Sequence, residues 1–256
     1  MSATSLDFAA WTARWDAQQG RYIADREGRF QVLFDALEAV AGEAPLTVVD
    51  LGCGPGSLGV RLLDRFSSAR VVAVDVDPVL LALGRGAYGG RDRLTFASAD
   101  LRDADWLENL GIDRADAAVS STALHWLGTG EIRRLYRDLA TLLRPGGIFL
   151  DADHARPGPG EAALAAVATR MTELHRERRG ADAAPAESWQ EWWDAVRTEP
   201  ALAGQLAERD RLGHAHPHGR SELSDDDHRR LLREAGFQAA DVVWRHGGDR
   251  VLAALR

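Results

Sequence analysis

The 256-residue chain is 45% hydrophobic and 27% charged, which is ordinary for a globular protein and suits one α/β domain with an insertion or a small second lobe. Its formal net charge of −8 disfavours binding to nucleic-acid phosphates, and its single cysteine excludes an internal disulfide or a zinc site of several cysteines. No apolar run approaches the ~18–20 residues of a membrane span and the N-terminal residues lack a signal-peptide pattern, so we expect a cytoplasmic protein.

Strand and helix patterns alternate over the first 154 residues. Two amphipathic helices are expected first, at 6–19 and 25–41. The expected strands are short apolar runs at 47–51, 69–77, 93–100, 115–124 and 148–153. The helices expected between these strands lie at 57–66, 78–87, 104–110 and 129–147. This alternation predicts a parallel sheet with helices on both faces, in which ligands bind at the carboxyl ends of the strands.

The regular alternation stops after residue 154. A helix is expected at 160–179, followed by a tryptophan cluster and the histidine-rich segment GHAHPHG. A further helix is expected to begin after Ser224 as its N-cap and to end at Gly236. The chain then closes with two apolar runs joined at HGGD, a pattern typical of an antiparallel hairpin.

The segment VVDLGCGPGSLG, residues 48–59, leads from the first strand into a glycine-rich loop. A nucleoside-triphosphate loop is excluded because it requires a lysine that this segment lacks. A dinucleotide fingerprint can be formed by Gly54, Gly56 and Gly59, but it leaves Gly52 unexplained and puts the carboxylate of Asp50 beside a pyrophosphate. The remaining interpretation is a nucleoside that carries a positive charge and no phosphate.

This loop resembles the first motif of the class I S-adenosylmethionine-dependent methyltransferases, which has the form acid-x-G-x-G-x-G. Four later segments resemble further motifs of that family, in order: VVAVDVDP, FASADL, DAAVSSTALHWL and LLRPGGIFL. The resemblance covers roughly residues 28–154 and the C-terminal hairpin. It implies a doubly wound α/β fold with a seven-stranded, mostly parallel sheet, a C-terminal antiparallel hairpin and a helical cap. The hairpin also argues against a dinucleotide-binding architecture.

The resemblance implies S-adenosyl-L-methionine as the cofactor and S-adenosyl-L-homocysteine as its product. Asp75 with Val76 is expected at the ribose, Asp100 with Leu101 at the adenine, and Ser120 near the methionine part. The loop residues expected around the cofactor are Asp50, Gly52, Cys53, Gly54 and Gly56. In this family the N-terminal region folds over the cofactor, so Arg29 and Tyr22 are candidates for contact with its carboxylate.

A few histidines and tryptophans are candidates for the acceptor pocket. His125 and Trp126 follow the fourth strand, where small-molecule branches of the family have a similar pair, and His154 ends the fifth strand. Both histidines are candidate proton acceptors; alternatively, His125 packs on the sheet edge and bonds to backbone. Trp189 and His214 are further pocket candidates, although the tryptophans around 189–193 could instead form a packed lid. No metal site is expected, because the histidines of HAHPHG lack an obvious carboxylate partner.

Four segments are expected: an N-terminal helical cap at 1–44, a cofactor-binding core at 45–154, a helical insertion or lid at 155–222, and the last helix and hairpin at 223–256. The predicted function is methyl transfer to an O, N or C atom of a small-molecule acceptor, by a monomer or homodimer without nucleic-acid or membrane partners. The alternatives are a tRNA or rRNA methyltransferase and a catalytically inactive cofactor-binding regulatory protein.

Overall fold

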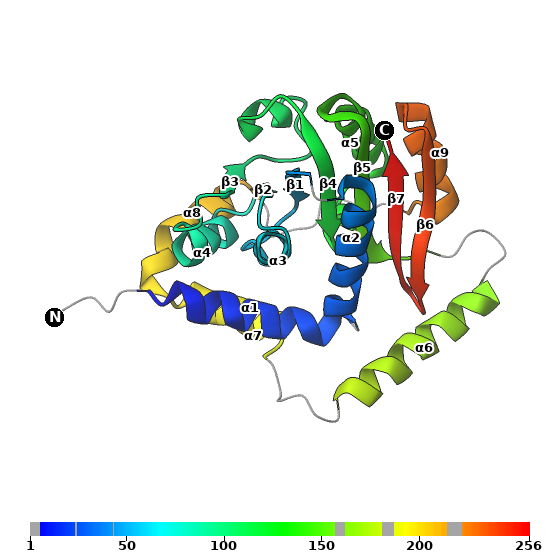
Figure 1. Cartoon of the computed structure of the whole chain (residues 1–256). Helices are drawn as coiled ribbons and strands as arrows, with labels where there is room; N and C mark the ends of the chain where they lie inside the picture. The colour runs from blue at the N-terminus through cyan, green and yellow to red at the C-terminus, as the bar shows by residue number, and fades with distance from the viewer. Residues whose placement is uncertain (1–5, 24, 43, 157–161, 181–186, 214–221) are drawn as a thin grey trace.

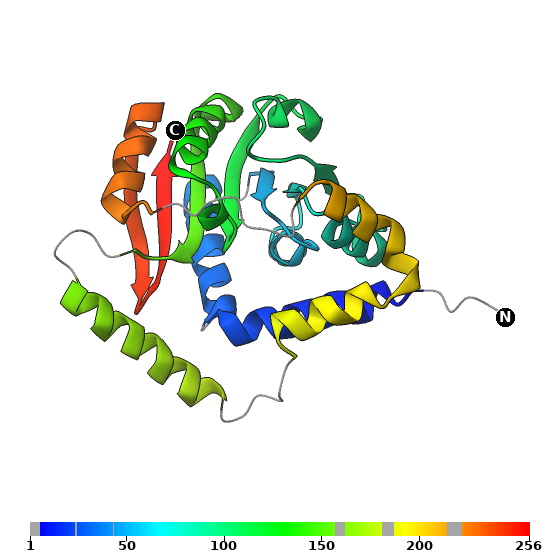
Figure 2. The same cartoon turned by 180° about the vertical axis from the view of Figure 1, so that it is seen from behind.

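The computed structural model describes residues 6–23, 25–42, 44–156, 162–180, 187–213 and 222–256. Seven strands form one sheet in the order β3-β2-β1-β4-β5-β7-β6 (Figures 1 and 2). Their bounds are β1 Thr47–Leu51, β2 Arg70–Asp75, β3 Leu94–Ser98, β4 Ala115–Ser121, β5 Leu143–His154, β6 Ala239–His246 and β7 Asp249–Leu255. The first five strands are parallel and the last two form an antiparallel hairpin on β5, which confirms the predicted fold class.

Helices cover both faces of the sheet. Those that precede or connect the strands of the core are α2 Arg26–Ala41, α3 Ser57–Arg65, α4 Pro78–Tyr88, α5 Thr129–Leu142 and α9 Asp225–Ala235. Apolar side chains of α2 and α3 form one core with one face of the sheet, whereas those of α5 and α9 form a second core with the other face. The sheet is therefore buried on both sides, as parallel strands require.

The boundary between α5 and β5 differs from the expected helix over 129–147. The helix ends at Leu142, and β5 begins at Leu143. The ring of Pro145 disfavours a helical conformation at Arg144. A side chain at Gly147 would lie 2.9 Å from the carbonyl oxygen of Asp116, so the backbones approach closely here. The Pro-Gly-Gly run therefore belongs to the strand instead of terminating the helix.

The C-terminal helix begins and ends as predicted. The hydroxyl of Ser224 accepts a hydrogen bond from the backbone N–H of Asp227, and the side chain of Asp227 accepts one in return from the backbone N–H of Ser224. Gly236 ends the helix with a φ of 105°, a conformation that favours glycine. Both ends of α9 are thus determined by residues that lie within the helix or next to it.

The carboxyl edge of the parallel strands is crossed by α1 Phe8–Tyr22 and α7 Trp189–Arg197. Two further helices, α6 Ala162–Gly180 and α8 Ala203–Arg211, also follow β5, and short 3-10 helices lie at Trp106–Leu110, Leu124–Trp126 and Pro200–Leu202. Figures 1 and 2 show α1 and α7 side by side across this edge, with α6 standing below the turn of the hairpin. Since α2 packs on a face of the sheet, only α1 of the expected N-terminal cap crosses the edge.

Two of the three neighbouring tryptophans hold α7 in place. Trp192 and Trp193 are buried, and the ring of Trp192 packs edge-on against the rings of Trp11 and Trp15 from α1. Trp189 is 42% exposed. None of the helices in the described part of the chain combines the length and the apolar character that crossing a bilayer requires.

Candidate functional site

The glycine loop after β1 adopts a backbone that glycine alone adopts without strain. Gly52, Gly54 and Gly56 have φ values of 66°, 56° and 93°. A Cβ atom at Gly52 would lie 2.3 Å from the Cβ atom of Ala123, so the segment that follows β4 meets the loop at that point. The N–H of Cys53 donates to the carbonyl of Val74 at 2.9 Å, which ties the loop to β2. The loop is thus held open at the carboxyl edge.

Asp50 links the end of β1 to the helix that follows the glycine loop. Its carboxylate is buried and accepts a hydrogen bond of 3.1 Å from the N–H of Gly59 in the first turn of α3. Burial raises the pKa of Asp50 to about 7, and the nearby charge of Asp75 adds to this effect. Asp50 therefore braces the loop, and its carboxylate is not exposed to the solvent.

Asp75 ends β2 beside the loop. Its Oδ2 accepts a hydrogen bond of 2.7 Å from the N–H of Gly54, and its Oδ1 accepts one of 2.9 Å from the N–H of Asp77. Burial raises the pKa of Asp75 to about 6. The side chain is half-buried, as is that of Val76 beside it. A carboxylate at this place can accept hydrogen bonds from hydroxyl groups of a ligand.

Asp100 and Leu101 follow β3, and Ser120 lies in β4. The carboxylate of Asp100 forms a two-pronged ion pair with Arg102, with a shortest distance of 2.6 Å. Leu101 is buried. The hydroxyl of Ser120 donates to the carbonyl of Leu51 at 3.0 Å and is fully buried. Its hydroxyl therefore joins β4 to β1, and only the backbone of Ser120 is left for a ligand.

Arg29 and Gln18 are fully buried, and their side chains have no hydrogen-bond partner among the described residues. The three guanidinium nitrogens of Arg29 donate to no acceptor in this part of the chain, and the carboxylate of Asp249 forms a long ion pair with Arg29 at 3.9 Å. Both polar atoms of the Gln18 amide also lack a partner in this part of the chain. Because such groups are costly to bury alone, they indicate an absent ligand or water. The sequence analysis missed Gln18. Its spacing from Trp11 along α1 could have indicated that the Gln18 side chain is buried, but not that it lacks a partner.

Tyr22 and Trp15 complete the helical cover. The hydroxyl of Tyr22 accepts a hydrogen bond of 3.1 Å from the N–H of Trp189, so its oxygen joins α1 to α7. The ring of Trp15 lies 3.6 Å from the position that a Cβ atom of Gly54 would take. One residue later, Asp16 accepts a hydrogen bond of 2.5 Å from the hydroxyl of Ser57. The first helix is therefore fastened over the glycine loop.

His125 forms a pair with a carboxylate that the sequence analysis did not single out. Its Nδ1 lies 2.9 Å and 3.0 Å from the two oxygens of Asp153, and since a carboxylate only accepts, Nδ1 carries the proton. Asp153 is buried. Burial by itself would raise the pKa of Asp153, but the hydrogen bond and charge of His125 hold it below its usual range. The alternative in which His125 bonds to backbone is not observed among the residues that the structure describes.

His154 forms a second pair of the same kind. Its Nδ1 lies 2.8 Å from Oδ1 of Asp249, and its backbone N–H donates to Asp153. Burial opposes ionisation of Asp249, but His154 and Arg29 together lower its pKa. The rings of His125 and His154 are 6.1 Å apart between centroids. The alternation in DADH could have pointed to Asp153, which lies one residue from His154, whereas Asp249 comes from the far end of the chain.

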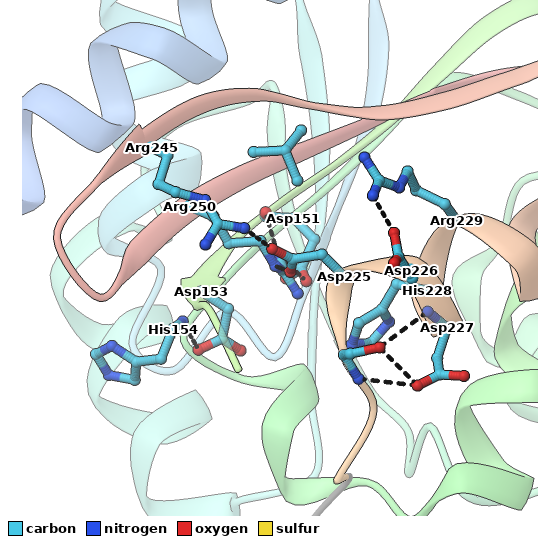
Figure 3. Close-up of polar contacts among 12 residues, drawn as sticks. Asp151, Asp153, His154, Asp225, Asp226, Asp227, His228, Arg229, Arg245 and Arg250 are labelled. Atoms are coloured by element: carbon cyan, nitrogen blue, oxygen red, sulfur yellow. Dashed lines mark hydrogen bonds and ion pairs between the residues drawn. The ribbon is translucent and has the colours of Figure 1, made fainter. Parts of the chain in front are cut away.

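A buried ionic network lies behind these pairs. The guanidinium of Arg250 donates to the side chain of Asp151 at 2.9 Å and to that of Asp225 at 2.8 Å (Figure 3). The hydroxyl of Tyr136 is 2.6 Å from Nδ1 of His228. Burial and the nearby Arg250 lower the pKa of His228 to about 3, so the ring is neutral and the tyrosine donates. The network joins β5, β7 and α9 beneath the carboxyl edge.

A small cavity opens at this edge. It is lined by residues of β5 and its neighbours, namely Leu124, His125, Asp151, Asp153, His154, Arg156, Leu223, His228 and Arg250. The ring centroids of Trp126 and His125 are 4.9 Å apart. Neither Trp126 nor Trp189 lines this cavity. His214 lies outside the described residues. Within the described ranges, no group of three His, Cys, Asp or Glu side chains is placed to hold a metal ion.

Comparison with known proteins agrees with this architecture. Residues 48–147 match a family profile described as a methyltransferase domain. The trans-aconitate 2-methyltransferase of Azoarcus sp. (strain BH72) is 30% identical over 244 residues, which is 88% of this chain and 90% of that protein. The enzyme of the same name from Rhodococcus jostii (strain RHA1) is 36% identical over 138 residues, which is 53% of this chain and 48% of that protein.

Solved structures share the fold at low sequence identity. An O-methyltransferase family protein from Burkholderia thailandensis superposes with a TM-score of 0.54 and 19% identity, over 93% of this chain and 62% of that one. Human N-acetylserotonin methyltransferase in complex with S-adenosylmethionine gives a TM-score of 0.51 and 14% identity, over 100% of this chain and 60% of that one. At these identities the likeness concerns the fold alone.

Proposed function

This chain belongs to the class I S-adenosylmethionine-dependent methyltransferases, and we propose that it methylates a hydroxyl group of a small molecule, with His125 as the proton acceptor. The observation that carries the proposal is the pair formed by His125 and the buried Asp153 at 2.9 Å. A positioned base of this kind is useful only where the acceptor must lose a proton, as a hydroxyl does.

The chain's own residues fit the cofactor at the glycine loop. Asp75 has a carboxylate at the end of β2 for the ribose hydroxyls, and the positive φ values of Gly52, Gly54 and Gly56 bring bare backbone to the same edge. The buried guanidinium of Arg29, which has no hydrogen-bond partner within the described ranges, suits the carboxylate of the methionine part. When bound, the cofactor supplies a methyl group on a positively charged sulfur. The loop contains no lysine or arginine, consistent with a ligand that lacks phosphate.

Further cofactor contacts are proposed for residues around these. Asp100 is opposite the adenine in this proposal and would share its carboxylate between the ligand and Arg102. Leu101 supplies an apolar surface for the ring, and Ser120 contributes its backbone, since its hydroxyl is bonded to Leu51. Tyr22 covers the site by joining α1 to α7.

His125 has the arrangement of a general base. Because Nδ1–H donates to Asp153, the unprotonated Nε2 is left at the cavity, and no partner for it is present among the described residues. Ionised Asp153 stabilises the imidazolium that forms when Nε2 takes a proton, and its burial strengthens that interaction. Asp153 thus positions the ring through Nδ1.

The relatives suggest a second candidate acceptor. Trans-aconitate, which the related enzymes are named for, is a carboxylic acid, and an ionised carboxylate accepts a methyl group without losing a proton. Methylation of such a group would leave His125 without a catalytic role. The two candidates therefore differ in how strongly the rate depends on His125.

The test is methyl transfer from a labelled donor to a panel of hydroxylated small molecules and carboxylic acids, with wild-type protein and His125→Asn. We expect a hydroxyl acceptor, a fall in kcat of about 10²- to 10⁴-fold in the variant, and unchanged affinity for S-adenosylhomocysteine. His246→Asn, at the end of β6, is the matched control and should retain full activity. Equal turnover by His125→Asn would reject the proposed role of this residue.

A further inference from the structure

Arg156 is the one charged side chain of the cavity lining that has no partner within the described residues. The lining also contains Asp151, Asp153 and Arg250, and each of these three is held by a hydrogen-bonded group of opposite or complementary charge. No hydrogen bond or ion pair of the half-buried Arg156 is found in the same part of the chain. Arg156 therefore brings an uncompensated positive charge to the edge that carries His125.

The position of Arg156 is determined by the end of β5. The backbone N–H of Ala155 donates to the carbonyl of Gly248 at 2.8 Å, so the strand stays attached to the hairpin turn directly before Arg156. His154, two residues earlier, is held by Asp249. Arg156 thus follows an anchored backbone and shares the cavity lining with His125 and His154.

The acidic residues of the cavity do not oppose an anion there. The charge of Asp151 is balanced by Arg250 at 2.9 Å, and Asp153 accepts from His125. Asp151 keeps one oxygen, Oδ1, without a partner among the described residues, but the net charge of its pair is zero. A cationic acceptor would therefore find no free carboxylate, whereas an anionic acceptor finds the guanidinium of Arg156, whose planar fork matches a carboxylate.

We infer that the acceptor is a hydroxy acid, with its carboxylate bound by Arg156 and its hydroxyl at His125. This inference rests on the proposed function. In the transfer, the O–H bond breaks and its proton moves to Nε2 of His125, while the hydroxyl oxygen forms the new O–CH3 bond. The electron pair of the broken S–CH3 bond stays on the sulfur, which becomes a neutral thioether. The product is a methoxy acid that keeps its carboxylate.

The inference is tested with related probes of similar size that differ in charge. We propose 3-hydroxybenzoate, its methyl ester and 3-hydroxybenzylamine as the aromatic series, and malate with its dimethyl ester as the aliphatic one. Binding is measured by calorimetry on the full-length protein saturated with S-adenosylhomocysteine, and methyl transfer is measured with labelled donor. Wild-type protein should bind at least one acid about 10- to 100-fold more tightly than its ester, as expected for a charged hydrogen-bonded pair.

Arg156→Gln should remove that preference, and Arg156→Lys should keep part of it. Arg170→Gln, on the exposed side of α6, is the control and should leave the preference unchanged. Thermal unfolding and S-adenosylhomocysteine affinity verify that each variant is folded. The inference is overturned if Arg156→Gln retains the preference, if the amine binds best, or if no acid binds better than its ester.

Failure of this inference is distinguishable from failure of the proposed function. If His125→Asn transfers methyl groups at the wild-type rate while Arg156→Gln loses the preference for acids, the anion site stands and the general base is wrong. If the reverse holds, the base stands and the carboxylate contact is wrong.

Discussion

The two halves of the carboxyl edge are built in different ways. Around β1 and β2, the proposed cofactor site consists of a glycine loop and of acids that accept hydrogen bonds from backbone N–H groups. These bonds span 2, 9 and 21 residues along the chain. Around β4, β5 and β7, the proposed acceptor site consists of side-chain pairs between distant residues. His125 and Asp153 are 28 residues apart, and His154 and Asp249 are 95 apart.

The pKa values of the buried carboxylates also differ between the two halves. Burial raises the pKa of Asp50 to about 7 and that of Asp75 to about 6, because neither carboxylate is paired with a cation. Asp153 and Asp249 are just as enclosed, but their histidine partners hold each pKa below its usual range. The comparison shows that the acids of one half accept hydrogen bonds from backbone N–H groups without a cation beside them, whereas the acids of the other half are each paired with an imidazole.

The largest effect is expected in the acceptor half. Asp153→Asn removes the charge that stabilises protonated His125 and can reverse the direction of the hydrogen bond, so we expect kcat to fall by about 10²- to 10⁴-fold. The affinity for S-adenosylhomocysteine, measured by calorimetry, should not change. A comparable loss of affinity would show that the two halves are not separable.

The converse variant concerns the cofactor half. Asp75→Ala should weaken S-adenosylhomocysteine binding by about 1–3 kcal/mol, since hydrogen bonds to an ionised group are lost. The pH dependence of kcat should stay that of the wild type. Asp64→Ala, an exposed carboxylate in α3, serves as the control. Unchanged affinity in Asp75→Ala would remove the ribose assignment.

The raised pKa values predict an effect of pH on stability. Asp50 and Asp75 have pKa values in the folded protein above those of the unfolded chain, so the folded state binds more protons between pH about 4 and about 7. Their contribution therefore makes the ligand-free protein less stable as pH rises through this range. Asp50→Asn, which can still accept from Gly59, should flatten the dependence of the urea midpoint on pH.

The opposite sign is expected for the acceptor half. Asp153 and Asp249 have lowered pKa values, so their stabilising contribution is present above the unfolded value of about 4 and is lost below it. Urea midpoints of Asp50→Asn that follow the wild-type curve at every pH would contradict this contrast.

The smallest effect is expected at Gln18. Its amide has no partner among the described residues, so Gln18→Leu should stabilise the ligand-free protein, by about 1 kcal/mol, because an unsatisfied buried group is removed. If Gln18 is a ligand of the cofactor, the same change should weaken S-adenosylhomocysteine binding. Stabilisation with unchanged affinity would identify Gln18 as a packing residue; Gln31→Leu, on the exposed side of α2, is the control.

The fold class and the residues of the proposed cofactor site could be predicted from local features of the sequence. The hydrophobic periods, the positions of the glycines in the loop, the acid at the end of β2 and the caps of α9 are all effects of neighbouring residues, and each agrees with the structure. The end of α5 was mispredicted by five residues because Leu143 pairs with Ala115 of β4, and backbone hydrogen bonds of Gly146 and Gly147 to Arg256 hold the Pro-Gly-Gly run in β5. Tertiary pairing outweighed the local stop signal there.

The amino-acid sequence by itself determined the succession of helices and strands along the chain, the glycine loop and the type of ligand that this loop suits. All of these depend on residues that are close together in the chain. Only the tertiary structure decided that Asp153 and Asp249 pair with His125 and His154. It also decided that, among the described residues, Arg29 and Gln18 are buried without hydrogen-bond partners and Arg156 lines the cavity without a partner. The physical reason is that burial and side-chain pairing depend on which strands become neighbours, and no periodicity records this.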